Sequence, residues 1–420
     1  MTTTDFLAEM AWRGMAYQQT DGAAEAFARG PITGYCGFDP TAASLHIGSL
    51  VPIMGLVHLQ RHGHRPVAMV GGGTGMIGDP SGKSAERTLL TRDHVAQNVA
   101  GVRAQLERFL DVSGPAGALI QDNADWLLSL GAVDFMRDVG KHFTVNYMLA
   151  KDSVKSRIEG GISYTEFSYM LLQGYDFLEL NRRHGVTVQI GGSDQWGNIT
   201  AGIELVRRVA GEEVHGVTFP LVTTSSGAKF GKTEAGAVWL DAALTSPYAF
   251  YQFWMTVDDR DVGRYLRYFT LLDRETITQL DAATQGHPER REAQQALARD
   301  VTTRVHSADA TRDAEDASRV LFAKGDPRTL SEGALTTLAR EVPSVVTTLG
   351  DVPTVIDAFV KAGLVKSKGE ARRLADQGGT YVNGERVPGA TEIAGMTRLA
   401  GNHLLLRKGV REYAVVRLTE

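Results

Sequence analysis

The feature that most constrains the fold of this chain is an alternation of short apolar runs with longer helical patterns. Apolar and β-branched residues gather at 32–38, 66–70 and 186–190, and each run ends in a glycine-bearing turn. Short runs of this kind, separated by helical patterns, are typical of strands in βαβ units. The alternation therefore predicts an α/β fold built on a parallel sheet.

Composition excludes several other classes of protein. The 420 residues are 43% hydrophobic and 22% charged, which is ordinary for a globular protein. The single cysteine, Cys36, excludes an intrachain disulfide framework and a cysteine-built zinc cluster, and it indicates a reducing compartment. Without a signal-peptide pattern or an apolar stretch near ~20 residues, we expect a cytoplasmic protein with no membrane role.

The composition of the sequence changes three times along the chain and so divides it into four regions. We expect an α/β domain over 1–246, a helical domain over 247–325, a linker region over 326–350 and a small module over 351–420. The last module carries 11 basic and 8 acidic residues, whereas the chain as a whole has 44 and 49 and a net charge of -5. This asymmetry predicts an anionic partner for the C-terminal module.

Two motifs follow the first predicted strand. Asp39-Pro40-Thr41-Ala42 and His46-Ile47-Gly48-Ser49 place a hydroxyl group and an imidazole beside a predicted helix N-terminus. Unpaired backbone N–H groups and the helix dipole favour phosphate at such a position. Taken alone, however, a histidine near a helix start is more often structural or solvated.

A glycine-rich segment and a lysine-rich segment offer further candidates for phosphate binding. The segment 71–84 lacks the glycine that a phosphate-binding loop would need at position 77, where the chain has isoleucine, so a flexible turn is the simpler interpretation. Lys83 could still contact phosphate as a point charge, and Arg87 could do so through the paired N–H groups of its planar guanidinium. Lys229 and Lys232 flank Phe230-Gly231 in a segment that could move toward a triphosphate, or form only a solvated basic turn.

The most informative predicted helix covers 165–180 and is opened by the capping-box pattern Ser163-Tyr164-Thr165-Glu166. Tyr169, Gln173 and Asp176 recur at i, i+4 and i+7, so they share one face of this otherwise apolar helix. The face is either solvent-exposed or directed into a cleft. A cleft with these groups would suit a small zwitterion that carries its own hydroxyl group.

In combination, these motifs resemble those of a bacterial-type tyrosyl-tRNA synthetase, a class I aminoacyl-tRNA synthetase. The resemblance rests on Tyr35 to Thr41, on His46 to Ser49 as a form of the HIGH motif, on the 169/173/176 face, on 191–198, and on Lys-Phe-Gly-Lys-Thr in place of KMSKS. The end of the chain, around 367–384, resembles a small RNA-binding module of ribosomal proteins. The motifs occur in the family's order and span nearly the whole chain.

The resemblance implies a Rossmann-like catalytic domain with a connective insertion, a helical anticodon-side domain, a C-terminal RNA-binding module and usually a homodimer. It also implies site residues of three kinds. Tyrosine would contact Tyr35, Asp79, Tyr169, Gln173, Asp176 and Gln195. ATP and the adenylate would contact Cys36, Gly37, Asp39, His46, Gly48, Ser49, Gly192, Asp194 and Lys232. The catalytic groups at the ATP phosphates would be Thr41, His46, Lys83, Arg87, Lys229 and Lys232.

The chemistry of this family requires no general base, because the carboxylate of tyrosine is already ionised at neutral pH. Attack on the α-phosphate needs alignment and stabilisation of the charge that grows on pyrophosphate. Mg²⁺ would arrive on the ATP phosphates rather than in a protein cage, so no protein-bound metal is expected. The tyrosyl group would then pass to the terminal ribose of tRNA(Tyr). Ser49 replaces the usual second histidine of HIGH, which keeps a hydrogen-bonding group and loses a possible cation.

Three alternative functions remain open at this point. A tryptophanyl-tRNA synthetase shares the class, but an indole offers only a donor and gives no use for a Tyr35 and Asp176 phenol site. A phosphate-loop kinase is disfavoured by the glycine spacing. A non-catalytic RNA-binding regulator would explain the C-terminal module but not the polar helix face.

Overall fold

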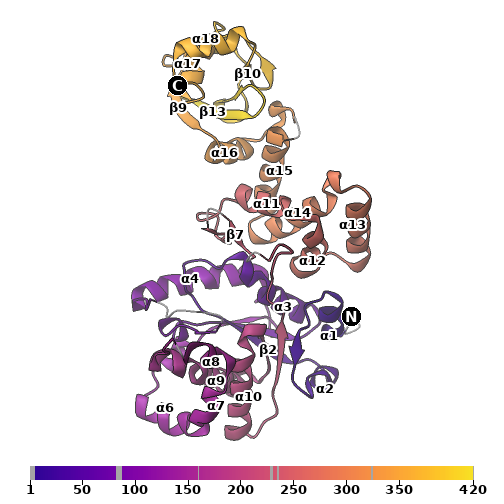
Figure 1. Cartoon of the computed structure of the whole chain (residues 1–420), viewed down its shortest axis with the longest axis vertical. Coiled ribbons are helices and arrows are strands. Elements are labelled where there is room, and N and C mark those ends of the chain that lie inside the picture. The colour runs from indigo at the N-terminus through magenta and orange to yellow at the C-terminus, as the bar shows by residue number, and fades with distance from the viewer. Residues whose placement is uncertain are drawn as a thin grey trace. The chain divides into compact units, whose positions relative to one another are not determined.

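A computed structural model describes residues 5–81, 88–158, 160–227, 230–233, 236–322 and 325–419 of the chain (Figure 1). The chain divides into two compact units. The first comprises residues 1–245 and 257–297, and the second comprises 246–256 and 298–420.

The first unit is built on a six-stranded sheet with the order β1-β6-β5-β2-β3-β4. The strands are β1 (Gln18–Gln19), β2 (Thr33–Phe38), β3 (Arg65–Val70), β4 (Leu119–Asp122), β5 (Val186–Gly192) and β6 (His215–Phe219). All neighbouring pairs are parallel except β1 with β6. The predicted α/β fold with a parallel sheet is confirmed, and the three apolar runs form the three central strands β2, β3 and β5.

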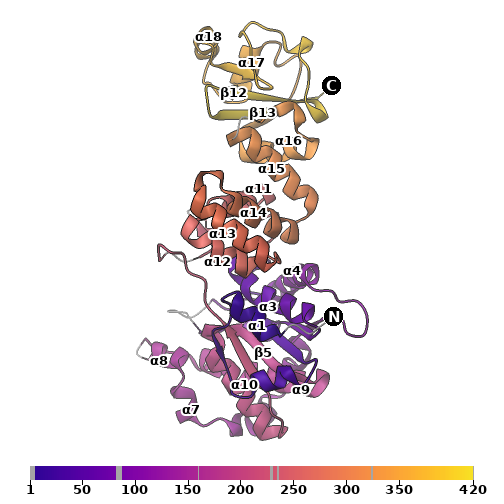
Figure 2. The ribbon, with the colours of Figure 1, turned by 90° about the vertical axis from the view of Figure 1, so that its right-hand side faces the viewer.

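Helices cover both faces of this sheet, as Figure 2 shows around β5. On β5, Ile190 lies against Gly55 of α3, whereas the adjacent Gln189 lies near Gly202 of α10, so α3 and α10 occupy opposite faces. The helices of this unit are α1 (Phe6–Trp12), α2 (Ala23–Ala28), α3 (Leu50–Arg61), α4 (Arg92–Phe109), α5 (Ala124–Leu127), α6 (Ala132–Asp138), α7 (Val145–Leu149), α8 (Asp152–Ile158), α9 (Tyr164–His184), α10 (Trp196–Val209), α12 (Asp259–Phe269) and α13 (Arg274–Gly286). A small hairpin joins β7 (Lys232–Thr233) to β8 (Gly236–Ala237).

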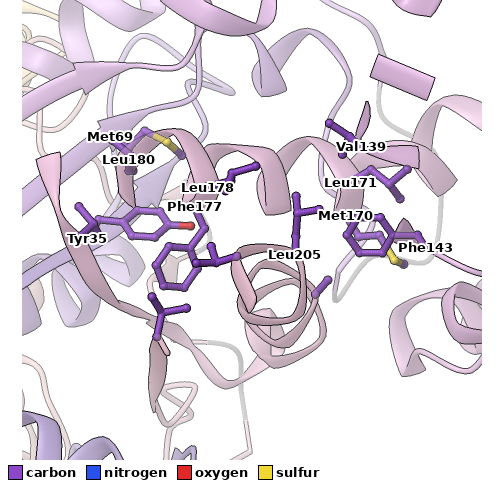
Figure 3. Close-up of a cluster of buried hydrophobic side chains, with 14 of the residues drawn as sticks. Tyr35, Met69, Val139, Phe143, Met170, Leu171, Phe177, Leu178, Leu180 and Leu205 are labelled. Atoms are coloured by element: carbon purple, nitrogen blue, oxygen red, sulfur yellow. The ribbon is translucent and has the colours of Figure 1, made fainter. Parts of the chain in front are cut away.

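Helix α9 is the helix that the capping-box pattern predicts over 165–180. The side chain of Ser163 accepts a hydrogen bond from the N–H of Glu166 at 3.2 Å, and Gly185 ends the helix with a φ of 62°. Its apolar side packs into a buried cluster with Tyr35 and Leu205 (Figure 3). This packing holds α9 in the core of the unit, where its residue Asp176 meets Asn123 just after β4.

The second unit contains a five-stranded sheet with the order β11-β10-β12-β13-β9. Its strands are β9 (Ser344–Thr348), β10 (Thr380–Val382), β11 (Glu385–Arg386), β12 (His403–Lys408) and β13 (Glu412–Thr419). Its helices are α11 (Pro247–Met255), α15 (Ala308–Phe322), α16 (Glu332–Glu341), α17 (Val355–Lys361) and α18 (Lys368–Asp376), while α14 (Glu292–Val305) crosses the division between the units. Phe359 of α17 and Leu404, Leu406 and Val416 of the sheet share a fully buried core.

The structure departs from the expected domain boundaries in two places. The expected linker region at 326–350 contains α16 and β9, and β9 pairs in parallel with β13, so the C-terminal sheet already begins there. The expected helical domain at 247–325 is divided, because residues 257–297 group with the first unit. The buried Arg13, which follows α1, explains this grouping, since its guanidinium donates to the carbonyls of Arg267 and Thr270 at the end of α12.

Candidate active site

The strand order creates a switch point between β2 and β5 in the first unit. From β2, the chain continues on one side to β3 and β4, and on the other side lie β5 and β6. Ligands of open α/β sheets bind in the crevice outside the carboxyl ends of strands at such a point. Asp39 directly follows β2, and Asp194 and Gln195 follow β5, so the predicted polar residues lie at this edge.

A chain of hydrogen bonds joins the ends of β2, β3 and β4 to helix α9. Thr74, just after β3, donates to Asp39 Oδ1 at 2.7 Å. The amide of Asn123, just after β4, donates at 2.9 Å both to Thr74 Oγ1 and to Asp176 Oδ2. Tyr169 completes the connection by donating its hydroxyl to Asp39 Oδ2 at 2.8 Å. Segments far apart in sequence are thereby held in one polar network.

Asp176 is fully buried at the centre of this network. Its second oxygen accepts a hydrogen bond from the indole of Trp126 at 2.7 Å. Burial raises the pKa of this carboxyl to about 8, although the hydrogen bonds from Asn123 and Trp126 act in the opposite direction. A perturbed carboxyl of this kind in a polar crevice is typical of a binding or catalytic site.

Tyr35 lies on β2 with its side chain fully buried, and its ring packs edge-on against Phe177 of α9 at 5.1 Å. Within the described part of the chain, its hydroxyl has no hydrogen-bond partner. Burial, followed by the charge of Asp176, raises the pKa of Tyr35 well above its usual value. A buried neutral hydroxyl without a partner is costly unless a ligand pairs with it.

A second group of polar side chains surrounds Asp79. Its two oxygens accept hydrogen bonds from the Gln195 amide at 2.6 Å and from the N–H of Ser81 at 2.9 Å. The amide of Asn198 lies 3.2 Å from Gln195 Oε1 and so orients that side chain. Burial, together with the charges of Asp39 and Asp79, raises the pKa of Tyr169 well above its usual value, so its hydroxyl stays protonated.

The polar face of α9 does not point to solvent. Tyr169, Gln173 and Asp176 are all among the buried residues of the helix, and Gln173 is 8% exposed. The face is therefore directed into the protein at the same edge of the sheet that holds Asp39. The alternative of a solvent-exposed stripe is wrong.

The His46 segment forms an exposed rim at the helix start. The N–H of Gly48 donates to His46 Nδ1 at 3.0 Å, which leaves the proton of a neutral imidazole on Nε2. Thr41 is also exposed, while Ser49 is partly exposed and stands at the N-cap of α3 without a side-chain capping bond. The imidazole can thus act as a hydrogen-bond donor.

Glycines and Cys36 line the same edge. Gly37 is exposed at the end of β2, and a Cβ at this position would lie 3.1 Å from Met69. A Cβ on Gly192 would lie 2.7 Å from Asp194 Oδ1, so glycine permits close approach there. Burial raises the pKa of Cys36 to about 12, which makes this thiol a poor nucleophile at neutral pH.

The glycine-rich turn after β3 does not act as a phosphate-binding loop in its described part. The N–H groups of Gly72 and Gly73 donate to Asp122 at 3.0 Å and to Asn123 at 2.7 Å. Donors that are already paired with protein oxygens are not available to cradle a phosphate. The turn instead fastens β3 to β4.

Lys83, Arg87 and Lys229 lie outside the described residues, and only the backbone of Lys232 is described, in β7. Three important residues were not predicted from the sequence, namely Thr74, Asn123 and Trp126. The only sequence signal for Asn123 and Trp126 is that they follow a short apolar run at 118–120, the position of a strand end.

No helix in the described part of the chain is long and apolar enough to cross a membrane. Among the same residues, no cluster of three or more histidine, cysteine or acidic side chains is arranged to hold a metal ion.

Comparison with known proteins defines the class first. A family model described as tRNA synthetases class I (W and Y) matches residues 28–323, and one described as a tyrosine–tRNA ligase SYY-like C-terminal domain matches 334–416. The chain therefore belongs to the class I tRNA synthetases of the tryptophan and tyrosine group.

Individual relatives point to one member of that group. The tyrosine–tRNA ligase of Anaeromyxobacter dehalogenans is 54% identical over 97% of both chains, and that of Roseiflexus castenholzii is 51% identical over 99% of this chain and 100% of the relative. Among solved structures, a C-terminally truncated mitochondrial tyrosyl-tRNA synthetase from Aspergillus nidulans superposes with a TM-score of 0.69. The two sequences are 29% identical, and the match covers 76% of this chain and 94% of the Aspergillus chain.

The raised pKa of Asp176 predicts a pH-dependent stability. Between pH ~4 and ~8 the unfolded chain releases this proton and the folded chain retains it, so stability falls as the pH rises. Relative to Asp176→Asn, the wild type should lose up to about 1.4 kcal/mol per pH unit in this range. Urea unfolding at pH 5, 6.5 and 8 measures the difference, and parallel pH profiles would contradict the prediction.

Proposed function

We propose that this chain activates L-tyrosine with ATP to form tyrosyl-adenylate and pyrophosphate, and then transfers tyrosine to the 3′-terminal ribose of tRNA(Tyr). The observation that carries the proposal is the unpaired, fully buried Tyr35 hydroxyl beside the buried Asp176 carboxyl. A phenol that entered this crevice would pair with both groups.

The phenol site selects by leaving polar groups unsatisfied when the wrong amino acid enters. Phenylalanine would leave the buried Tyr35 hydroxyl unpaired and would offer no hydrogen-bond donor to Asp176. Asn123 and Trp126 act as positioning residues here, because their donors fix both Asp176 oxygens. The same argument disfavours tryptophan, whose indole offers a single donor and no acceptor.

The ammonium group of tyrosine would lie among Asp79, Tyr169 and Gln173. Asp79 and the nearby Asp39 supply negative charge, and Tyr169 is oriented by its hydrogen bond to Asp39. Gln195 holds Asp79 in place through the 2.6 Å contact. The amino acid would thus be fixed at both ends, which supplies the alignment that the first step needs.

The adenylate and the phosphates would lie along the exposed rim of the crevice. Cys36, Gly37, Asp39, Gly48, Ser49, Gly192 and Asp194 would line the adenylate. Thr41, His46, Lys83, Arg87, Lys229 and Lys232 would face the phosphates and stabilise the charge on departing pyrophosphate. His46 suits this role because its Nδ1 is occupied by Gly48 and its Nε2 carries the proton. Mg²⁺ would accompany ATP on the phosphate oxygens, where it neutralises charge.

The C-terminal module would contact tRNA, and the helical part of the chain, expected over 247–325, would lie on the anticodon side. Arg372 and Arg373 are exposed on α18, whereas Lys368 is engaged with Asp357 at 2.7 Å. Arg407 of β12 stacks over the ring of Tyr381 of β10 at 3.8 Å, which holds a cation on the C-terminal sheet. These groups suit RNA phosphates and shape rather than base reading.

The protein would act as a homodimer in the cytoplasm. Large apolar side chains are exposed on consecutive helices between 128 and 164, namely Leu128, Val133, Met136, Val145, Leu149, Ile158 and Tyr164. Exposed apolar side chains that recur along one stretch of helices are typical of a protein interface. In the same stretch, Arg157 of α8 forms a buried ion pair with Glu166 of α9 at 2.8 Å. A second copy of the chain is the occupant that the homodimeric family favours.

Tyrosine-dependent exchange between ATP and pyrophosphate tests the catalytic proposal, with phenylalanine and tryptophan as controls. Asp176→Asn and Tyr35→Phe should each lower the tyrosine to phenylalanine ratio of kcat/KM by about tenfold or more, since each removes a partner of the phenol. Unchanged ratios in both variants would refute the phenol site. Exchange driven equally by tryptophan would favour the tryptophanyl alternative, and no exchange at all would favour an RNA-binding regulator.

The RNA-binding role of the module is tested in the full-length chain by Arg372→Glu combined with Arg373→Glu. We expect normal tyrosine-dependent exchange, weaker tRNA binding and a salt slope reduced by about 2, because each arginine would neutralise one RNA phosphate. Arg417→Glu, an exposed position on β13 away from α18, is the matched control. Filter binding from 50 to 200 mM salt gives the slope, and equal effects of the variant and the control would reject the assignment.

The dimer surface is tested by Val133→Asp combined with Met136→Asp, because both side chains are exposed on one face of α6. Charges buried without partners should shift the chain toward monomers in sedimentation equilibrium. Val112→Asp introduces a charge at an exposed valine outside this surface and should leave the mass unchanged. A dimer of undiminished stability in the double variant would place the interface elsewhere.

A further inference from the structure

One face of helix α12 contacts the segment that leads into the predicted Lys-Phe-Gly-Lys-Thr motif at 229–233. Asp261, Tyr265 and Phe269 are spaced i, i+4 and i+8 on this helix and so share a face, which we call the docking face. The carboxylate of Asp261 accepts the N–H of Ser225 at 2.9 Å, and the Tyr265 hydroxyl donates to the carbonyl of Thr223 at 3.3 Å. The segment from 223 therefore runs along α12.

Phe230 makes the last and largest contact with the docking face. Its ring stacks on Phe269 with a centroid distance of 5.3 Å and an interplanar angle of 7°, and it meets the edge of Tyr265 at 5.0 Å. The side chain is only 7% exposed, although its sequence neighbours are polar or glycine. An aromatic side chain buried in a polar segment anchors that segment by its apolar area and ring geometry.

The next residue contacts the other signature motif of the unit. Gly231 has a φ of 79°, and a Cβ there would lie 2.9 Å from Ile47 of the His46-Ile47-Gly48-Ser49 motif. Its carbonyl accepts the N–H of Val238, whose own carbonyl accepts the N–H of Ile47 at 3.0 Å. The backbone after Phe230 is thus held against the motif that carries His46.

The docking face itself is held rigidly. Arg13, just after α1, donates to the carbonyls of Arg267, Thr270 and Leu272, which caps the C-terminus of α12. The Tyr268 hydroxyl also donates to the carbonyl of Gly14 at 3.0 Å. Helix α12 is therefore a fixed support within the same unit as the sheet.

We propose that Phe230 is a positioning residue for the activation step, and that its ring, docked on Tyr265 and Phe269, sets the backbone position of Lys232 two residues later. The inference rests on the proposed role of Lys232 at the ATP phosphates. Removing the ring would leave the ammonium group of Lys232 in the chain but would release its segment from α12. Charge stabilisation in the transition state would then weaken, while the tyrosine pocket would stay intact.

The first test compares Phe230→Ala with Phe27→Ala in the full chain. Phe27 is a matched control because it is 8% exposed and its ring stacks on Phe6 at 5.2 Å in the same unit, without contacting the docking face. The pre-steady-state rate of adenylate formation should fall about 10- to 100-fold in Phe230→Ala. Its tyrosine Kd and its unfolding midpoint should differ from wild type no more than those of Phe27→Ala.

Phe230→Met serves as the rescue variant. Methionine restores apolar bulk and can place its sulfur against the rings of Tyr265 and Phe269. Most of the missing rate should therefore return. Failure of methionine to recover any of the rate, with normal folding, would contradict an anchoring role.

A double-mutant cycle tests whether Phe230 acts through a lysine. In a Lys232→Ala background, Phe230→Ala should slow adenylate formation by less than about threefold, because the group that it positions is already absent. Additive losses, wild-type rates in Phe230→Ala, or a loss of tyrosine affinity in step with the rate would each overturn the inference. A wild-type chain without tyrosine-dependent exchange would instead reject the proposed function.

Discussion

The site depends on the hydrogen bonds that Asp176, a buried carboxyl group, accepts from the protein. Asp176 is removed from water, so burial disfavours its charged form and its oxygens need hydrogen-bond donors from the protein. Asn123 and Trp126 supply them, and Asn123 also accepts the N–H of Gly73 at 2.7 Å. One asparagine therefore fixes both the carboxylate of α9 and the glycine turn after β3.

The glycines of this turn follow from the same constraint. A Cβ on Gly71 would lie 2.2 Å from Asp39 Oδ1, and a Cβ on Gly72 would lie 2.3 Å from Asp122 Oδ1. The carboxylates that end β2 and β4 thus pack directly against the backbone that follows β3. What resembles part of a phosphate-binding loop in the sequence is a turn whose close packing requires glycine.

Local patterns predicted the elements that are defined by local interactions. The strands β2, β3 and β5 and the helix α9 follow from apolar runs and a capping box, and the α9 spacing was enough to place Tyr169, Gln173 and Asp176 together. Asn123 and Trp126 were missed because their partner lies 50 or more residues away and no periodicity marks them.

Strand β9 was missed for a related reason. It is a short edge strand whose partner, β13, lies at the far end of the chain, so the serine- and threonine-bearing segment at 344–348 is easily read as a linker. The lysine segment was identified by its charges, whereas its support, α12, could not be inferred from them. The packing of Phe230 on Tyr265 and Phe269 is a tertiary contact that only the fold reveals.

Three carboxylates converge near Tyr169, and their mutual repulsion links the two ends of the proposed amino-acid site. Burial is the largest cause of the raised pKa of both Asp176 and Tyr169, and neighbouring charges add to it. Asp39 and Asp122 raise the pKa of Asp176 further, while Asp39, Asp79 and Asp176 raise that of Tyr169. An ammonium group held beside Asp79 would offset this negative charge and lower the pKa of Asp176. The ionised Asp176 then accepts the hydrogen bond of the phenol O–H more strongly, and by reciprocity the bound phenol favours the ammonium group. A ligand that carries both groups would therefore bind better than either group alone would predict, which is the behaviour expected of a site built for a zwitterion with a hydroxyl group at its far end.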